Sequence, residues 1–104
     1  MKTLRDFENR PIRLTSERRD HILKHPEMAR MLGAIAETVR SPEWVVQSAS
    51  DERARLHYRY YYGTAVGDKY LCVVVKVAGN DAFIITAYLT DAIKAGVGLW
   101  PRKP

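Results

Sequence analysis

The spacing of hydrophobic residues changes once along the chain. Apolar residues recur every three or four positions between residues 28 and 39, at Met28, Met31, Leu32, Ile35, Ala36 and Val39. That period places them along one side of a helix. After Pro42 the apolar residues alternate with polar ones or form short β-branched and aromatic runs, which is typical of strands. The pattern predicts helices in the first half of the chain and a sheet in the second.

Capping and helix-breaking residues set the expected boundaries. Thr15 or Ser16 can cap a first helix over residues 16–25, because the side-chain oxygen accepts from a free backbone N–H. Pro26 ends this helix and begins a second one, since proline lacks the N–H that a continuing helix needs. The predicted strands are 11–15, 44–47, 54–62, 70–77 and 82–89, and the tail at 91–96 is expected to add a helical turn.

The order of these elements predicts the fold class. The turns between the later strands are short, and this favours antiparallel neighbours because parallel neighbours need a long crossover. We therefore expect an α+β fold with N-terminal helices packed on an antiparallel β-sheet of about four strands. A chain of 104 residues has room for one domain, predicted at 11–100, with an arm at 1–10 and a tail at 101–104.

Sorting the strands by face predicts where polar side chains gather. Placing Val77 opposite Phe83 sets Val74 against Thr86 in the last hairpin, and Tyr62 is placed opposite Leu71 in the hairpin before it. One face is then apolar and suits the helices, and the other carries side chains that could bind a phosphate. The alternative is a solvent-exposed face with charges outward. The second face collects His57, Arg59, Tyr61, Lys76, Thr86 and Tyr88.

Two histidines lie four residues apart on the first helix and project from the same side of it. His21 is a candidate acid or base, because the pKa of an ordinary histidine lies close to neutral pH. The alternative is a structural histidine at the contact between helix and sheet, and His25 before Pro26 suits a cap. A zinc-protease helix carries glutamate after its first histidine, but Ile22 stands there, so we expect no metal.

Composition and charge leave two explanations open. The formal net charge is +5 with a pI near 9.6, which fits an anionic partner such as nucleic acid but equally fits simple solubility. The single cysteine, Cys72, excludes an internal disulfide framework and indicates a reducing compartment. No apolar run approaches the roughly 18 residues of a membrane span, and the polar start lacks a signal-peptide stretch. We therefore expect a cytoplasmic protein that does not associate with a membrane.

Several segments together resemble a known superfamily. They are Arg13–Arg18 leading to His21-Ile22 and His25-Pro26-Glu27-Met28, then Glu37–Pro42, Tyr70–Val77 and Phe83–Leu89. Their order and spacing are similar to the phage-associated nuclease-like domains of the barnase, EndoU, colicin and RelE-like (BECR) ribonuclease superfamily. The resemblance covers roughly residues 11–100. It implies N-terminal helices followed by an antiparallel sheet, and a metal-independent ribonuclease of toxin or phage type.

The resemblance also implies roles for particular residues. It places His21, Lys76, Thr86 and Tyr88 along an active cleft, to which the sorting of faces adds Arg59. These five are the expected catalytic residues for attack of a ribose 2′-hydroxyl on the adjacent phosphate. Beside them, the residues expected to bind substrate are His25, His57 and Tyr61. The expected partners are an RNA substrate and an immunity or antitoxin protein, with no cofactor and no metal; the alternative is a non-catalytic RNA- or protein-binding module.

Overall fold

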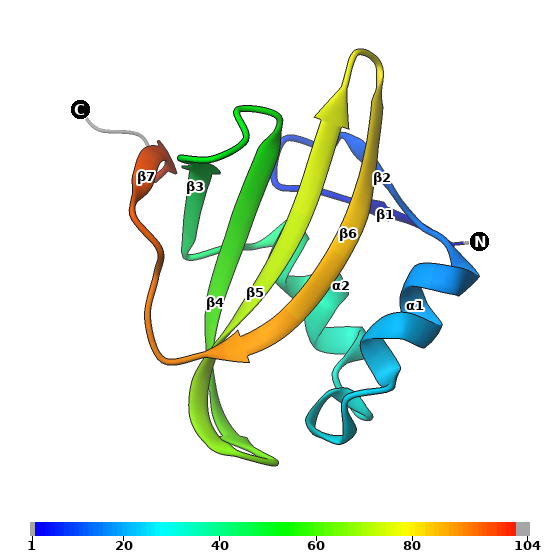
Figure 1. Cartoon of the computed structure of the whole chain (residues 1–104), viewed down its shortest axis with the longest axis vertical. Helices are drawn as coiled ribbons and strands as arrows, with labels where there is room; N and C mark the ends of the chain where they lie inside the picture. Colours follow the sequence, from blue (N-terminus) through cyan, green and yellow to red (C-terminus); the bar gives the residue numbers. More distant parts are fainter. Residues whose placement is uncertain (1, 102–104) are drawn as a thin grey trace.

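The computed structural model describes residues 2–101 and shows a curved sheet with helices on one side (Figure 1). The helical elements are α1 (Ser16–Leu23), the 3₁₀ turn η1 (Pro26–Met28) and α2 (Leu32–Arg40). The strands are β1 (Lys2–Arg5), β2 (Pro11–Leu14), β3 (Trp44–Ser48), β4 (Ala54–Thr64), β5 (Gly67–Ala78), β6 (Asp81–Thr90) and β7 (Gly96–Trp100).

The sheet is mixed and larger than expected. Its strand order is β1-β2-β6-β5-β4-β3-β7, and β2 lies parallel to β6 while the other neighbours are antiparallel. The prediction of an antiparallel sheet of about four strands is therefore wrong. The prediction counted the segments that form β3 to β6, whose aromatic and β-branched residues mark them as strands. It missed that β2 joins the same sheet and that β1 and β7 extend it at both edges.

The two edge strands form in segments without a clear strand pattern. Residues 2–5, within the expected arm, pair with β2 and bury only Leu4. The expected helical turn at 91–96 is absent, and the chain enters β7 at Gly96 instead. A Cβ at Gly96 would lie 2.2 Å from the carbonyl oxygen of Gln47, so the close approach of β7 to β3 needs glycine at this position.

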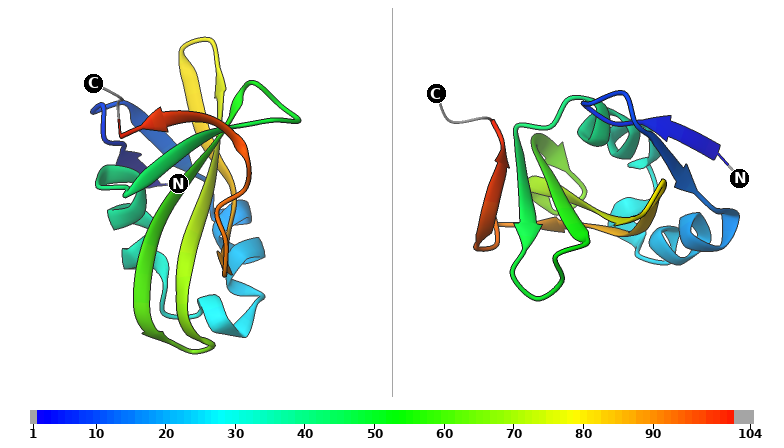
Figure 2. Two further views of the ribbon diagram at one scale, coloured as in Figure 1. Left: turned by 90° about the vertical axis from the view of Figure 1, so that its left-hand side faces the viewer. Right: turned by 90° about the horizontal axis from the view of Figure 1, so that it is seen from above.

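The helices match the prediction at their start more closely than at their junction. Thr15 caps α1 by accepting a hydrogen bond from the Arg18 N–H, as expected. Pro26 opens only the short η1, and α2 begins at Leu32. The predicted second helix from Pro26 is therefore divided into two pieces. Both α1 and α2 lie on the same side of the sheet (Figure 2).

Most of the hydrophobic core lies between the helices and this side of the sheet, which we call the helix-covered face. Burial of these side chains against one another is the main favourable contribution to folding. The buried members are Leu4, Ile12, Leu14, Ile22, Met28, Ile35, Val39, Leu71, Val73, Val75, Ala82, Ile84 and Ala87.

The observed register of the β4–β5 hairpin differs from the predicted one. Leu71 pairs with Arg59 instead of with Tyr62, a slip of three residues. Because side chains alternate, an odd slip moves every side chain of β4 to the other face. The cause is the turn: the strands extend as far as Thr64 and Gly67 with a bulge near positive-φ Gly63, where the sequence suggested a six-residue loop.

The hairpin of β5 and β6 keeps its predicted register in part. Val74 lies opposite Thr86 and Cys72 opposite Tyr88, as expected. A bulge then shifts the pairing, so that Val75 lies opposite Ile84 and Lys76 opposite Phe83. An extra residue in β6 at this point exchanges the faces of the residues beyond it. Phe83 therefore leaves the helix-covered face on which it was predicted.

Candidate functional site

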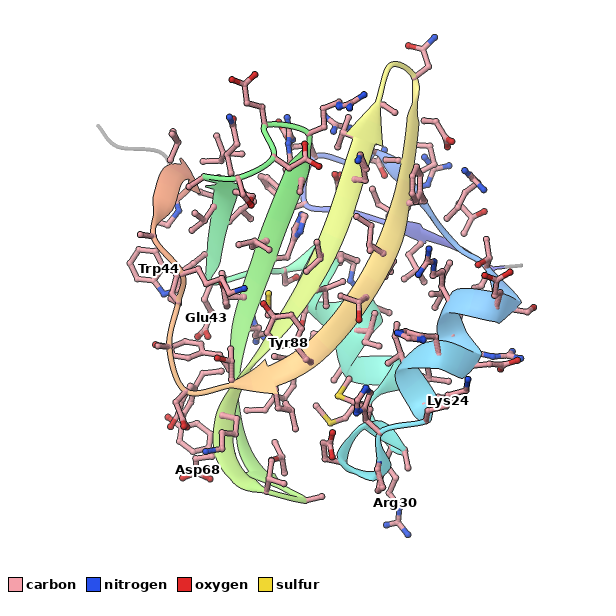
Figure 3. All side chains as sticks on the ribbon, in the orientation of Figure 1. Lys24, Arg30, Glu43, Trp44, Asp68 and Tyr88 are labelled. Atoms are coloured by element: carbon pink, nitrogen blue, oxygen red, sulfur yellow. The ribbon has the colours of Figure 1, made fainter. Side chains whose placement is uncertain are left out.

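The side of the sheet turned away from α1 and α2 is the candidate site, and we call it the open face. Three of the five predicted catalytic residues share it, namely Lys76, Thr86 and Tyr88 on β5 and β6. Tyr88 points toward the viewer from this face in Figure 3. Thr86 lies across from Val74, and its neighbour on the same face is Tyr88, across from Cys72. All three predicted side chains are partly exposed.

Aromatic side chains concentrate on the same face. Five of the six tyrosines belong to it, because the even-numbered positions of β4 pair with even-numbered positions of β5. The rings of Tyr60 and Tyr70 lie 4.8 Å apart, and those of Tyr60 and Tyr62 lie 5.1 Å apart, both edge to face. Tyr62 is 80% exposed, and Trp44, opposite Tyr58, is 47% exposed. The aromatic residues of the open face on β3 to β6 are Trp44, Tyr58, Tyr60, Tyr62, Tyr70, Phe83 and Tyr88.

The segment between β6 and β7 brings a lysine to this face. The backbone N–H of Lys94 donates to the Tyr58 hydroxyl at 3.1 Å, and its Nζ lies 5.8 Å from the centroid of the Tyr88 ring. Among residues 2–101, no carboxylate lies within ion-pair distance of Lys94. Ile93 packs beside it on the small cluster of Val46, Leu56, Tyr58 and Cys72. Lys94 is therefore held by its backbone, with its ammonium group over a tyrosine and available to an anion.

Two further cations flank Phe83 at the other end of the open face. The Arg13 guanidinium lies 5.4 Å from the Phe83 ring and also pairs with Asp81 at 2.6 Å. Lys76, opposite Phe83, pairs with Asp51 at 3.2 Å. These exposed carboxylates offset part of the positive charge, so this end is less strongly cationic than the Lys94 end.

The hydroxyl groups of the open face are proton donors at neutral pH. Burial raises the pKa of Tyr58 to about 12. Burial, followed by the hydrogen bond with Cys72, also raises the pKa of Tyr88. Burial also raises the pKa of the Cys72 thiol. Cys72 therefore acts as a small buried hydrophobic residue rather than as a nucleophile. A tyrosine kept protonated in this way can donate a hydrogen bond but does not serve as a base near pH 7.

Arg59 and Tyr61 lie on the helix-covered face, which corrects their predicted place in the cleft. The Arg59 Nη1 donates to the Ser41 carbonyl at 2.7 Å, and its Nε lies 3.4 Å from a Glu37 carboxylate oxygen. The Tyr61 hydroxyl donates to the same carboxylate at 2.6 Å, and burial raises the Tyr61 pKa to about 12. Glu37, on α2, thus ties the helix to β4, and these two side chains act in packing.

His57 is also on the helix-covered face, where it is 1% exposed. Its ring packs edge to face against Phe7 with centroids 6.0 Å apart, and within residues 2–101 neither ring nitrogen forms a hydrogen bond of normal geometry. Burial lowers the His57 pKa to about 4, only partly opposed by backbone carbonyls and by buried Asp6. The prediction that His57 faces the cleft is wrong, because the odd register slip turned it inward.

His21 and His25 lie on the other side of the molecule from the open face. Both are exposed on or after α1, which covers the helix side of the sheet. The Nδ1 of His25 lies 3.6 Å from a Glu27 oxygen, while the His21 side chain forms no ion pair within residues 2–101. The structure therefore does not bring His21 together with Lys76, Thr86 and Tyr88. All three histidines of the chain are within the described part, and none lies on the open face.

Sequence reasoning missed Lys94 and Arg13 as members of the site. Lys94 falls in a segment expected to form a helical turn, and nothing in the local pattern indicates that it folds back over Tyr88. Arg13 could have been found, since Ile12 and Leu14 on either side are apolar and alternation sends it to the opposite face. Finding it also required knowing that β2 lies beside β6.

Comparison with known proteins adds no information about the function of this site. No protein-family model, no curated protein and no solved structure matches the chain. Within residues 2–101 no group of three or more histidine, cysteine, aspartate or glutamate side chains could hold a metal ion. No helix in that range is long and apolar enough to cross a membrane.

Proposed function

We propose that the domain binds single-stranded RNA on its open face. The observation that carries the proposal is the arrangement around Tyr88, where Lys94, which has no acidic partner among residues 2–101, lies over the ring beside further aromatic side chains. Cations beside aromatic side chains form the usual surface for single-stranded nucleic acid, because phosphates bind the cations and bases stack on the rings. The net charge of +5 agrees with an anionic partner.

The phosphate-binding part of the proposal rests on four groups. Lys94 supplies the unpaired positive charge, and Lys76 supplies a second that Asp51 partly offsets. Thr86 and Tyr88, two positions apart on β6, present hydroxyl groups on the same face. Hydroxyl donors and ammonium groups together bind phosphate oxygens without requiring a fixed geometry.

The base-binding part rests on the tyrosines at the hairpin end. Tyr60, Tyr62 and Tyr70 are partly or largely exposed and hold one another in edge-to-face contacts. Rings that are already ordered lose little conformational entropy when a base stacks on them. Each stacked base contributes about 1–3 kcal/mol to binding, with little dependence on sequence.

A second candidate is metal-independent cleavage of the bound RNA. The contact of Lys94 with Tyr88 favours it, because a protonated tyrosine beside a lysine suits donation of a proton to the leaving oxygen and stabilisation of the charged phosphorane. The 2′-hydroxyl also needs a base, and no histidine lies on the open face. Binding is therefore better supported than cleavage. An immunity or antitoxin partner is proposed only together with cleavage, because only an active nuclease would need one.

Fluorescence anisotropy with a labelled RNA of mixed sequence tests the binding proposal. We expect Lys94→Ala to weaken binding about tenfold and to reduce the slope of log affinity against log salt by about 0.7, the value for one lost phosphate contact on a single strand. Lys24→Ala, at the exposed C-terminal cap of α1, is the matched control and should bind like the wild type. Equal loss in both variants, or no binding by the wild type at low salt, would contradict the proposal.

The same samples, analysed on a denaturing gel with and without chelator, test cleavage. Products that form in both conditions and disappear in Tyr88→Phe would support the second candidate. Intact RNA at saturating protein would leave binding alone as the function. Products that require the metal would contradict a metal-free reaction.

A further inference from the structure

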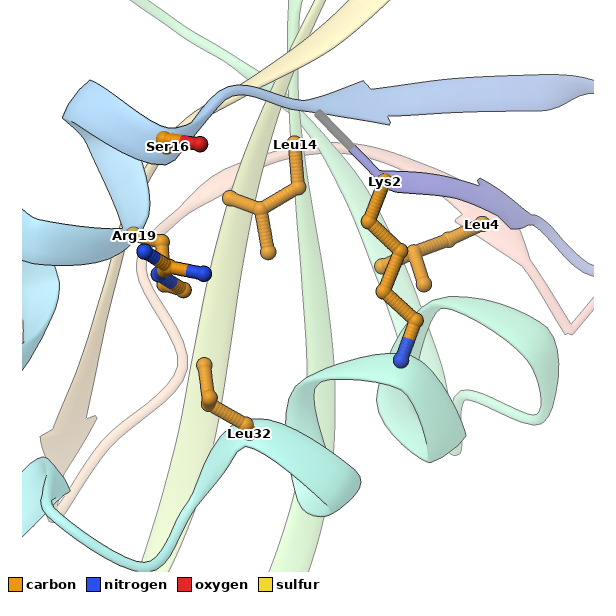
Figure 4. A pocket seen from close by; sticks show the side chains of 6 residues that line it. All are labelled: Lys2, Leu4, Leu14, Ser16, Arg19 and Leu32. Carbon is orange, nitrogen blue, oxygen red and sulfur yellow. The ribbon is translucent and has the colours of Figure 1, made fainter.

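A cavity lies on the helix side of the molecule, well away from the open face. Its volume is about 260 Å³, and it lies between the β1–β2 hairpin and the two helices (Figure 4). This is slightly smaller than the roughly 300–1,000 Å³ of ordinary ligand pockets. A ligand of modest size would fill it. The residues that line it are Lys2, Leu4, Leu14, Ser16, Arg19 and Leu32.

The cavity combines an apolar wall with two cations. Leu4 and Leu14 are 8% and 6% exposed and belong to the main core, while Leu32 at the start of α2 is 37% exposed. In Figure 4 the Arg19 side chain enters from α1 on one side and the Lys2 side chain from β1 on the other. An apolar surface that ends at positive charges is complementary to a ligand with an aliphatic part and an anionic end.

The charge balance selects a monovalent anion. The Arg19 Nη2 lies 3.2 Å from a carboxylate oxygen of Asp20, an exposed pair that offsets about one positive charge. Lys2 has no ion pair with any residue in the described range 2–101. Among residues 2–101, the two cations that line the cavity and the Asp20 carboxylate beside Arg19 sum to a single net positive charge. Leu32, 37% exposed, offers apolar contact that a ligand would cover.

We propose that this cavity binds an aliphatic monocarboxylate with a chain of roughly six to eight carbons, a size that fits a pocket near the lower limit for ligands. The carboxylate lies between Lys2 and Arg19, where the guanidinium can bind both of its oxygens. The aliphatic chain packs on Leu4, Leu14 and Leu32. The ligand contacts no residue of the open face, so the proposal does not depend on RNA binding.

Titration of the ¹⁵N-labelled protein with octanoate, followed by NMR, tests the proposal. We expect saturable shifts at the amides of Leu4, Leu14, Ser16 and Leu32, and no saturable shift on β5 and β6. In the series acetate, butanoate, hexanoate and octanoate, affinity should rise by up to about fourfold for each methylene buried. Octanamide has the same length without the charge and should bind at least tenfold more weakly than octanoate.

Variants separate the cavity from general surface binding. Lys2→Gln and Arg19→Gln should each weaken octanoate about tenfold or more, as expected for loss of a hydrogen bond between charged groups. Arg18→Gln, exposed on the same helix but outside the cavity, should bind like the wild type. Affinity that is independent of chain length, equal binding of octanamide, or unchanged affinity in both cavity variants would overturn the proposal.

Discussion

The two faces of one sheet differ in what covers them. The helix-covered face is closed by α1, η1 and α2, and within residues 2–101 thirteen buried hydrophobic residues form one cluster between this face and those elements. The open face holds four, Val46, Leu56, Tyr58 and Cys72, with Ile93 from the connecting segment packed on them. Both faces are built from the same strands. The comparison shows that the coverage by other elements decides which face is buried as a core and which is available to ligands.

The polar residues of the two faces differ in the same way. On the helix-covered face, Arg59 and Tyr61 meet the Glu37 carboxylate of α2, and His57 is buried at 1% exposure. On the open face, Thr86 and Tyr88 are partly exposed and Lys94 has no acidic partner among residues 2–101. Polar groups that face a helix are used in packing, and those that face solvent can bind a ligand.

The comparison predicts that truncating a buried side chain under the helices destabilises the protein far more than truncating a side chain on the open face. Ile35→Ala removes a fully buried side chain of α2, and we expect a loss of about 2–5 kcal/mol in the free energy of unfolding. Thr86→Ala on the open face should change it by less than about 1 kcal/mol. Urea denaturation followed by circular dichroism measures both. Equal losses would mean that the open face is as tightly packed as the other.

The buried histidine makes the helix-covered face sensitive to acid. The folded-state pKa of His57, about 4, is below its ordinary value of 6.5, so the unfolded state binds more protons between these values. Stability should therefore be full above pH 6.5 and fall by about 3 kcal/mol as the pH is lowered through 4. Urea denaturation at a series of pH values measures the fall.

Variants assign that acid sensitivity to one residue. His57→Leu should flatten the fall between pH 6.5 and 4, whatever its effect on stability at neutral pH. His21→Gln, exposed on α1, should keep the dependence of the wild type. A wild-type curve that is flat across this range would show that the imidazole is not buried as a neutral group.

The edge strand β7 packs closely against β3, and this contact is expected to contribute to stability. A Cβ at Gly96 would approach Gln47 O to 2.2 Å and Val46 Cγ1 to 2.7 Å, whereas a Cβ at Gly98 meets nothing within 4 Å. We expect Gly96→Ala to destabilise by about 1–3 kcal/mol, as for other overpacked sites. Gly98→Ala should be close to neutral. The two thermal melts, recorded side by side, test whether β7 is docked as described.

The smallest effect on stability is expected at the outermost aromatic residue. Tyr62 is 80% exposed, so Tyr62→Ala should change the free energy of unfolding by less than about 0.5 kcal/mol. Under the proposed function it should still weaken RNA binding by about fivefold or more, since one base loses its stacking partner. Anisotropy and denaturation on the same preparation separate the two quantities. A variant that is destabilised but binds normally would assign Tyr62 to structure.

Local sequence patterns predicted the elements of the sheet centre but not their full pairing. The Thr15 cap, the four strands β3 to β6 and the pairing of Cys72 with Tyr88 follow from side-chain type and short-range spacing. The register of β4 on β5 does not, because it depends on a two-residue turn and a bulge near Gly63 that extend both strands into the expected loop. That one error transferred Arg59, His57 and Tyr61 between faces.

The candidate site shows the same division. Lys76, Thr86 and Tyr88 could be grouped from the sequence because they lie on adjacent strands of one hairpin. Lys94 and Arg13 joined them only in three dimensions, through a connecting segment and a strand far away in the chain. The sequence alone determined the antiparallel centre of the sheet, the amphipathic helix and the grouping of Lys76, Thr86 and Tyr88, since these depend on periods of two and 3.6 residues. The tertiary structure decided which side chains of β4 the helices cover, because an odd slip in register, here of three residues, moves every side chain of the strand to the other face.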